Sequence, residues 1–304
     1  METSKHKKTF GLALSGSGNR TSFYVGFLEE LEKAELRPDY ISASSGGSFV
    51  AAAYGAGRLN EMKRFMSDMD ETKAMSLLTR AGIKSGGIYS LEKAYEELSG
   101  ITQGANFEDA QIKMSFSAVD IESGELVNLC MGDLAKAALI SCTLPGLFVP
   151  MKWGSRTLVD GGLLVMMPTD VLKKAGIDVV VGVNMRGTEH IFTEKQLTVK
   201  KIYNFFKKIT FLDSFDNIID NLGQEQGEDG IRTPNFFTVL GKSLDLAIQA
   251  NSGDVNKNQC DLEIVPNIPK LKRGRLDKQA NLRFYEMGRQ SALENIPQIR
   301  NLIN

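Results

Sequence analysis

Two turns of small residues near the start of the chain constrain its fold more than any other feature. The first turn, "GSGN", follows a short apolar run at residues 10–14 and precedes a helical pattern with one apolar face. The second turn, "SSGG", follows the run "PDYISA" and opens the almost wholly apolar stretch "SFVAAAYGAG". Strand, turn and helix repeated in this way predict parallel strands and a buried second helix. We therefore predict an α/β fold with a mainly parallel central sheet.

The same alternation continues to about residue 186. "KMSFSAVDI" and "ELVNLC" predict a hairpin around "ESG", and "DLAKAALISC" predicts a helix that stops near Pro145. "RTLVDGG" predicts a strand that ends in a turn, and "IDVVVGVNM" predicts a buried strand. Residues 59–110 are predicted to be mainly helical, with a turn at "KSGGIYS". We expect residues 10–186 to form one core and residues 187–304 to form a mainly helical C-terminal elaboration packed on it.

The composition argues against several classes of function. A formal net charge of -1 gives no large positive field, so we expect no nucleic-acid partner. With 2 His and no clustered Cys, a zinc or iron site is not expected. The 3 Cys are widely spaced, which favours reduced thiols in a cytosol-like compartment.

Nothing in the sequence predicts membrane insertion. No apolar run approaches the ~18 residues needed to cross a bilayer. Glycines interrupt the basic N-terminus too soon for the apolar region of a signal peptide. We therefore expect a cytoplasmic protein whose contact with a membrane would be peripheral.

The first turn matches a nucleotide-binding loop only in part. Gly16 and Gly18 fit the first two positions of GxGxxG, but Thr21 occupies the third. Asp39 has a tolerable spacing for the acidic residue, yet it precedes the second strand, where it could not reach a ribose. No GK[ST] follows the turn, which excludes a phosphate-binding P-loop. A dinucleotide site is the weaker interpretation.

The second turn fits a serine nucleophile. Ala43, Ser45 and Gly47 give the pattern small-x-Ser-x-small between a strand and a helix, where large neighbours would clash. The glycine-rich first turn could supply main-chain N–H donors for an oxyanion. Turns at the carboxyl ends of adjacent parallel strands lie at one edge of the sheet. Taken alone, however, "ASSGG" is more often an ordinary strand-helix turn.

Two residues compete for the role of general base. Ser45, Asp160 and His190 follow the chain order of an α/β-hydrolase triad. Only one strand precedes that of Ser45, which is too few for that fold, and His190 also fits a surface loop. Asp160 ends a predicted strand before two glycines, an arrangement that exposes a carboxylate or forms a plain Asp-Gly turn. His6 lies in a polar tail and is expected to be solvated.

Four blocks follow one another in the chain and carry more information together than separately. They are "LALSGSGNRTSFYVGFLEEL", "ISASSGGSFVAAAYGAG", "ALISCTLPGLFVPM" and "TLVDGGLLVMMP". In this order the sequence resembles the patatin-like phospholipase family, from about residue 10 to residue 185, with a fainter echo in "DLEIVPNI" and "YEMGRQSA". The resemblance implies a three-layer α/β/α fold and hydrolysis of lipid acyl esters by a Ser–Asp dyad without histidine. It also implies that no metal or organic cofactor is required.

Carried over to this sequence, the resemblance makes Ser45 the nucleophile and Asp160 the base. It assigns the oxyanion loop to Gly16, Ser17, Gly18, Asn19 and Arg20, and the elbow and second turn to Ala43, Gly46, Gly47, Gly161 and Gly162. Arg20 would steady the loop or meet a lipid phosphate.

Three residues depart from the family pattern. The family's loop is usually GGGxRG, and here Ser17 and Thr21 replace glycines, while Ala43 replaces the leading Gly of GxSxG. Each departure could shift the donor geometry, and misalignment of one oxyanion donor can cost about 10²–10³ in rate. A slow enzyme, or one that needs activation, is therefore an open alternative.

One C-terminal segment could face lipid. In "KKIYNFFKKITF", residues 200–211, the apolar side chains fall on one helical face with lysines around them. This pattern is typical of a helix on an anionic membrane surface. A helix packed over the core with a solvated lysine rim has the same pattern.

Two alternatives compete with a lipid hydrolase. The first is a non-hydrolytic lipid-binding or regulatory homologue that keeps the scaffold without the chemistry. The second is a general carboxylesterase or thioesterase. The sequence leaves the oligomeric state and the lipid specificity open.

Overall fold

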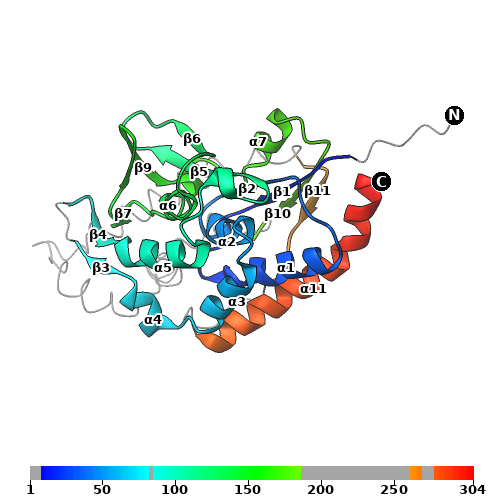
Figure 1. Cartoon of the computed structure of the whole chain (residues 1–304), viewed down its shortest axis with the longest axis horizontal. Helices are drawn as coiled ribbons and strands as arrows, with labels where there is room; N and C mark the ends of the chain where they lie inside the picture. Colours follow the sequence, from blue (N-terminus) through cyan, green and yellow to red (C-terminus); the bar gives the residue numbers. More distant parts are fainter. Residues whose placement is uncertain (1–7, 82–84, 186–259, 269–276) are drawn as a thin grey trace, which may run out of the picture.

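The apolar runs that precede the two small-residue turns form adjacent parallel strands, β1 (Phe10–Leu14) and β2 (Tyr40–Ala43). The computed structural model describes residues 8–81, 85–185, 260–268 and 277–304 (Figure 1). The central sheet follows the order β11-β10-β1-β2-β5-β9-β8, and β6 pairs with β5. Its other described strands are β5 (Lys113–Asp120), β6 (Leu126–Leu129), β8 (Met151–Trp153), β9 (Arg156–Asp160), β10 (Val179–Val183) and β11 (Leu262–Ile264). The pairs from β11 to β5 are parallel and the others antiparallel, so the sheet is mainly parallel, as predicted.

Helices cover both faces of this sheet and give the predicted three-layer α/β/α architecture. The described helices are α1 (Ser22–Lys33), α2 (Gly46–Gly55), α3 (Leu59–Ser67), α4 (Glu71–Ser76), α5 (Glu92–Thr102), α6 (Leu134–Ile140), α7 (Thr169–Lys174) and α11 (Lys278–Ile303). Figure 1 shows α7 above the sheet and α1 and α11 below it. Because successive side chains of a strand point to opposite faces, Leu12 and Leu14 join the main core, whereas Ala13 packs in a separate cluster with Leu172 of α7.

The sheet brings the ends of β2 and β9 together. Phe116 of β5 pairs with Ala43 of β2 on one side and with Leu129 of β6 on the other. Two residues further on, Ala118 pairs with Asp160 of β9 and, across the strand, with a residue of β6. Since β6 occupies one edge of β5, β2 and β9 must share the opposite edge. The antiparallel β9 therefore ends, at Asp160, just beyond the carboxyl end of β2.

The C-terminal helix α11 packs along α1. The two helices approach closely where glycines meet backbone, because a Cβ on Gly26 would overlap Tyr285 and a Cβ on Gly288 would overlap Phe23. Arg289 of α11 is paired with Glu30 of α1 at 2.7 Å between Nε and Oε1. Residues 186–259 and 269–276 lie outside the described residues, so the predicted division at residues 186 and 187 stays a prediction.

The segment "KSGGIYS" was wrongly predicted to be only a turn. Gly87–Ser90 forms strand β4, which pairs with β3 (Thr79–Arg80) and β7 (Gly146–Phe148) in a second, smaller sheet. The sequence lacks a strand pattern here because β4 is four residues long and its parallel partner lies far along the chain. No helix within the described ranges has the length and apolar character that a membrane crossing requires. Residues 200–211 and both histidines, His6 and His190, fall outside those ranges.

Candidate active site

Ser45 lies in a strained turn between β2 and α2. Its backbone has φ 49 and ψ -129, a conformation that residues with a side chain rarely adopt. The turn is tight because α2 starts against the end of β1, and a Cβ on Gly47 would lie 2.8 Å from the carbonyl oxygens of Leu14 and Ser15. Ala43 is fully buried at the last position of β2. Ser45 itself is only partly buried, unlike its neighbours Ser44 and Gly46, which are buried.

Asp160 faces this serine across the sheet edge. The Ser45 Oγ donates a hydrogen bond to Asp160 Oδ2 at 2.9 Å, although the two residues are 115 positions apart in the chain. The other carboxylate oxygen, Oδ1, accepts the N–H of Gly162 at 2.7 Å. Asp160 is buried, and a Cβ on Gly161 would overlap the backbone of Ser117. Gly161 thus lets the turn approach β5 closely, and Gly162 orients the carboxylate of Asp160.

The glycine-rich loop after β1 lies against the nucleophile. A Cβ on Gly16 would be 3.3 Å from Ser45 Cβ and 2.6 Å from Met166 Sδ, so glycine lets the loop backbone approach the serine. The N–H of Gly16 donates to Met166 O at 3.1 Å. Within the part of the chain that the structure describes, the N–H groups of Ser17 and Gly18 have no acceptor. They are the loop donors available to an oxyanion.

The carbonyl groups of the loop are held by side chains. Ser17 O accepts both the N–H and the Nε of Arg20, each at 3.2 Å. Gly18 O accepts the Thr21 hydroxyl at 2.8 Å. Because the N–H of a trans peptide points opposite to its C=O, fixing these two carbonyls also fixes the directions of the Gly18 and Asn19 N–H groups. Arg20 therefore contacts the loop itself, which is one of the two roles considered for it.

The two departures from the family's loop contact each other. Ser17 Oγ and Thr21 Oγ1 lie 3.1 Å apart, and both residues are buried. Thr21 gives its single hydroxyl proton to Gly18 O, so Ser17 donates to Thr21. The pair also lies against the first residue of α2, since a Cβ on Gly46 would overlap Ser17 Oγ. Sequence reasoning identified these residues as substitutions but not as a connected pair.

Sequence reasoning also missed two serines that hold the backbone of Ser45. The N–H of Ser45 donates to Ser141 Oγ at 2.9 Å, and the carbonyl of Ser45 accepts the Ser48 hydroxyl at 2.6 Å. Both serines are fully buried. Ser141 belongs to the quoted block "ALISCTLPGLFVPM", which was the only sequence signal for it.

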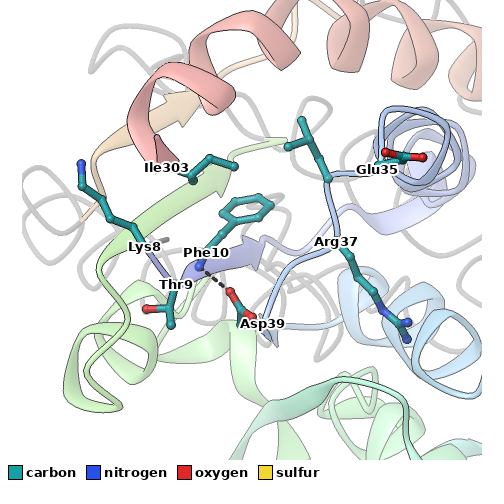
Figure 2. Close-up of a pocket in the computed structure, with 8 residues that line it drawn as sticks. Lys8, Thr9, Phe10, Glu35, Arg37, Asp39 and Ile303 are labelled. Carbon is teal, nitrogen blue, oxygen red and sulfur yellow. Dashed lines mark hydrogen bonds between the residues drawn. The ribbon is translucent and has the colours of Figure 1, made fainter. Parts of the chain in front are cut away.

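Asp39, the acidic residue considered for a ribose, has a structural explanation. Asp39 lies at the amino end of the strands, where its Oδ2 accepts the N–H of Phe10 at 2.7 Å. It lines a pocket of about 110 Å³ with Lys8, Glu35 and Arg37, at the end of the sheet opposite Ser45 (Figure 2).

Burial of the sulfur and the nearby charge of Asp160 raise the pKa of the Cys142 thiol well above its ordinary value. That thiol therefore stays protonated, which disfavours it as a nucleophile.

No group of three or more His, Cys, Asp or Glu side chains that could hold a metal ion occurs among the residues with described positions. The described site places a hydroxyl group in hydrogen-bond contact with a carboxylate, beside main-chain N–H donors. This combination suits attack on a carbonyl carbon followed by proton transfer.

Comparison with known proteins identifies relatives of this chain. A family model for patatin-like phospholipases matches residues 12–173. An uncharacterized NTE family protein of Mycobacterium tuberculosis is 28% identical over 178 residues, which cover 59% of this chain and 49% of that protein. Lysophospholipase NTE1 of Candida albicans is 28% identical over 179 residues, covering 58% of this chain and 13% of that protein. The chain thus spans about half the length of the curated relatives that it matches first.

Two solved structures align with most of the chain at low sequence identity. VipD from Legionella pneumophila aligns with 96% of this chain and 67% of its own, with 14% identity and a TM-score of 0.48. Human GIVD cytosolic phospholipase A2, in complex with an inhibitor, aligns with 97% of this chain and 60% of its own, with 10% identity and a TM-score of 0.42. Both TM-scores are too low to add to what the sheet order itself establishes about the fold.

Proposed function

Since this chain belongs to the patatin-like phospholipase family, we propose that it hydrolyses carboxylic esters of lipids through an acyl-enzyme on Ser45, with Asp160 as the base. One observation carries the proposal. The Ser45 hydroxyl lies 2.9 Å from a buried carboxylate, beside a loop whose Ser17 and Gly18 N–H groups have no acceptor among the described residues. The strain at Ser45 supports it, because such strain is concentrated at sites where a side chain must be held for chemistry.

In the first step, Asp160 Oδ2 takes the proton from Ser45 Oγ as that oxygen attacks the acyl carbonyl carbon. The carbonyl oxygen becomes an oxyanion next to the N–H groups of Ser17 and Gly18, which would donate to it. The tetrahedral intermediate then breaks its bond to the alcohol oxygen. Asp160 returns the proton to that oxygen, and the alcohol or lysolipid leaves the acyl group on Ser45.

In the second step, water attacks the acyl-enzyme while Asp160 accepts one of its protons. Collapse of the second oxyanion breaks the bond to Ser45 Oγ, which recovers its proton from Asp160, and the fatty acid is released. The hydrogen bond from Gly162 to Asp160 Oδ1 keeps Oδ2 directed at the serine through both steps. This chain's own residues supply every proton transfer.

The dyad is tested with Ser45→Ala and Asp160→Asn. We expect either change to lower turnover of a p-nitrophenyl ester by at least about 10³-fold and to abolish labelling by a fluorophosphonate probe, because nucleophile and base act as a unit. Asp120→Asn is a matched control, since Asp120 is a buried carboxylate of the same sheet whose Oδ1 accepts the N–H of Glu122. It should keep turnover close to that of the wild type.

Two results would contradict the proposal. Asp160→Asn could retain turnover while His190→Ala abolishes it, which would replace the dyad with a triad. Alternatively, the wild-type protein could resist the fluorophosphonate probe while still binding fatty acid, which would favour a non-hydrolytic lipid-binding homologue.

The substrate class follows from the family and is part of the same proposal. Lysophospholipase NTE1 of Candida albicans is named for hydrolysis of a lysophospholipid, and we propose a lipid ester for this chain as well. A mixed lipid extract, with products identified by mass spectrometry, would distinguish phospholipid from lysophospholipid substrates. Turnover of acyl thioesters or short esters alone would favour the thioesterase or carboxylesterase alternative.

A further inference from the structure

We propose that Ser141 is a positioning residue for the nucleophile, holding the backbone of Ser45 in the conformation that presents its hydroxyl to Asp160. This inference rests on the proposed function of the Ser45–Asp160 pair. It concerns a residue outside the loop, the elbow and the Asp-Gly-Gly turn. Ser141 follows helix α6 directly and is fully buried.

The first observation is the contact itself. The N–H of Ser45 points at Ser141 Oγ at 2.9 Å, within the ordinary range for such a hydrogen bond. Ser45 lies two residues beyond the end of β2, and among the described residues its N–H has no main-chain acceptor. A side-chain acceptor is therefore needed at this turn, and among the described residues Ser141 supplies it.

The second observation is that the carbonyl of Ser45 is also held, by a serine that lies beside α6. The Ser45 carbonyl accepts the Ser48 hydroxyl at 2.6 Å, and the same hydroxyl lies 3.1 Å from the carbonyl of Ala138 in α6. Helices α2 and α6 are in contact. The strained residue is thus held on both sides, through Ser48 and through Ser141.

The third observation links this helix end to the base. The N–H of Asp160 donates to the carbonyl of Thr143 at 2.8 Å, two residues after Ser141. Residues 141–143 therefore accept hydrogen bonds from the main-chain N–H groups of both the nucleophile and the base. That short stretch sets the spacing between the Ser45 hydroxyl and the Asp160 carboxylate. Of the two links, the one to Ser45 depends on a side chain, so a single substitution can remove it.

The experiment compares four variants of Ser141 and a control. Ser141→Ala removes the acceptor, whereas Ser141→Thr keeps a hydroxyl oxygen. Ser141→Val has the same shape as the Thr variant, with a methyl group in place of the hydroxyl. We expect Ser141→Ala and Ser141→Val to lower kcat and the rate of fluorophosphonate labelling by about 10- to 100-fold, because small misplacement of a reacting group has effects of this size. KM should change by less than about threefold, and Ser141→Thr should recover most of the loss. Ser141→Cys, whose sulfur is a weak acceptor, should lie between Thr and Val.

Ser42→Ala is the matched control. Ser42 lies three residues before the nucleophile, is fully buried, and donates its hydroxyl to Pro168 O at 2.7 Å. Its loss removes a buried hydrogen bond of the same kind without touching Ser45 or Asp160. We expect kcat and labelling within about twofold of the wild type.

Each outcome decides one question. The inference would be overturned if Ser141→Ala kept the labelling rate and kcat of the wild type. It would also be overturned if the Thr variant were as slow as the Val variant, since packing would then explain the loss. If the Ala variant does not fold, the Thr and Val pair still makes this comparison. If Ser45→Ala retains labelling, the proposed function fails, whatever Ser141 does. If Ser45→Ala abolishes labelling and Ser141→Val does not slow it, only the positioning role fails.

Discussion

Acidic residues at the two ends of the parallel strands are used differently. At the amino end, Asp39 Oδ2 accepts the N–H of Phe10, and Asp178 accepts the N–H of Thr9 at 2.8 Å. These carboxylates complete the hydrogen bonding of strand starts, and Asp39 also lines a pocket there (Figure 2). At the carboxyl end, one oxygen of Asp160 accepts a main-chain N–H and the other faces the Ser45 hydroxyl. The direction of the strands therefore separates a structural acid from one that can take part in chemistry.

Glycines show the same contrast. At the carboxyl end, a Cβ on Gly47 or Gly161 would meet main-chain atoms that cannot move independently of the sheet. Away from the site, a Cβ on Gly100 of α5 would meet nothing within 4 Å. At the crowded end the turns pack so closely that a side chain at these positions would meet main-chain atoms.

The largest effect that would test this contrast is expected from Gly47→Ala. The added methyl group would lie 2.8 Å from two carbonyl oxygens, so α2 or the end of β1 must shift. Such overpacking costs about 1–3 kcal/mol of stability. Because a shift of about 1 Å can misplace a nucleophile enough to cost 10²-fold, we expect kcat to fall by about that factor. Urea unfolding and ester turnover measure the two effects separately.

The matched control is Gly100→Ala. This glycine lies inside α5 with open space around it, and alanine is favoured over glycine in a helix by about 0.5–1 kcal/mol. We expect a small gain in stability and unchanged turnover. Equal losses of activity in the two variants would mean that the carboxyl end is no more tightly constrained than the surface helix, and the contrast would fail.

An intermediate effect is expected from the hydroxyl pair in the loop. Ser17→Ala or Thr21→Val interrupts the hydrogen bonds that run from Ser17 through Thr21 to Gly18 O. Since that carbonyl belongs to the loop whose N–H groups would meet the oxyanion, we expect kcat to fall about tenfold, equivalent to about 1.4 kcal/mol of transition-state stabilisation. The double variant should be about as slow as the slower single variant, because the two hydroxyls act in series. Steady-state kinetics on the folded variants measures both expectations.

Ser22→Ala tests whether any buried hydroxyl here would have the same effect. Ser22 follows Thr21 directly, and its buried Oγ has no hydrogen-bond partner among the described residues. We expect wild-type kinetics. A strictly additive double variant of Ser17 and Thr21 would show instead that the two departures act independently on the loop.

The features that could be predicted are those that residues close together in the sequence determine. β1, β2 and the turns after them were predictable because each apolar run and its small residues lie within a few positions of one another. The pairing of Ser45 with Asp160 was predictable only through the family resemblance. It depends on β2 and β9 pairing one after the other along the same edge of β5. No periodicity in the sequence encodes that arrangement.

The contacts that could not be predicted depend on how elements pack. Ser141 meets Ser45 because the end of α6 lies against the start of α2, and a serine after a helix has no distinctive sequence signal. β4 was missed because its strand is short and its parallel partner is distant. The place of Asp39 before the second strand could be predicted, but its hydrogen bond to Phe10 required the structure.

The smallest effect is expected at the amino end of the strands. Asp39→Ala removes the acceptor for the Phe10 N–H, which should lower the free energy of unfolding by about 1 kcal/mol, the usual net value of such a hydrogen bond. Turnover should stay within about twofold of the wild type, because Asp39 lies at the opposite end of β1 and β2 from Ser45. Urea unfolding with kinetics on the folded fraction separates the two quantities. A tenfold fall in kcat without loss of stability would mean that the amino end contributes to the chemistry, and strand direction would no longer distinguish Asp39 from Asp160.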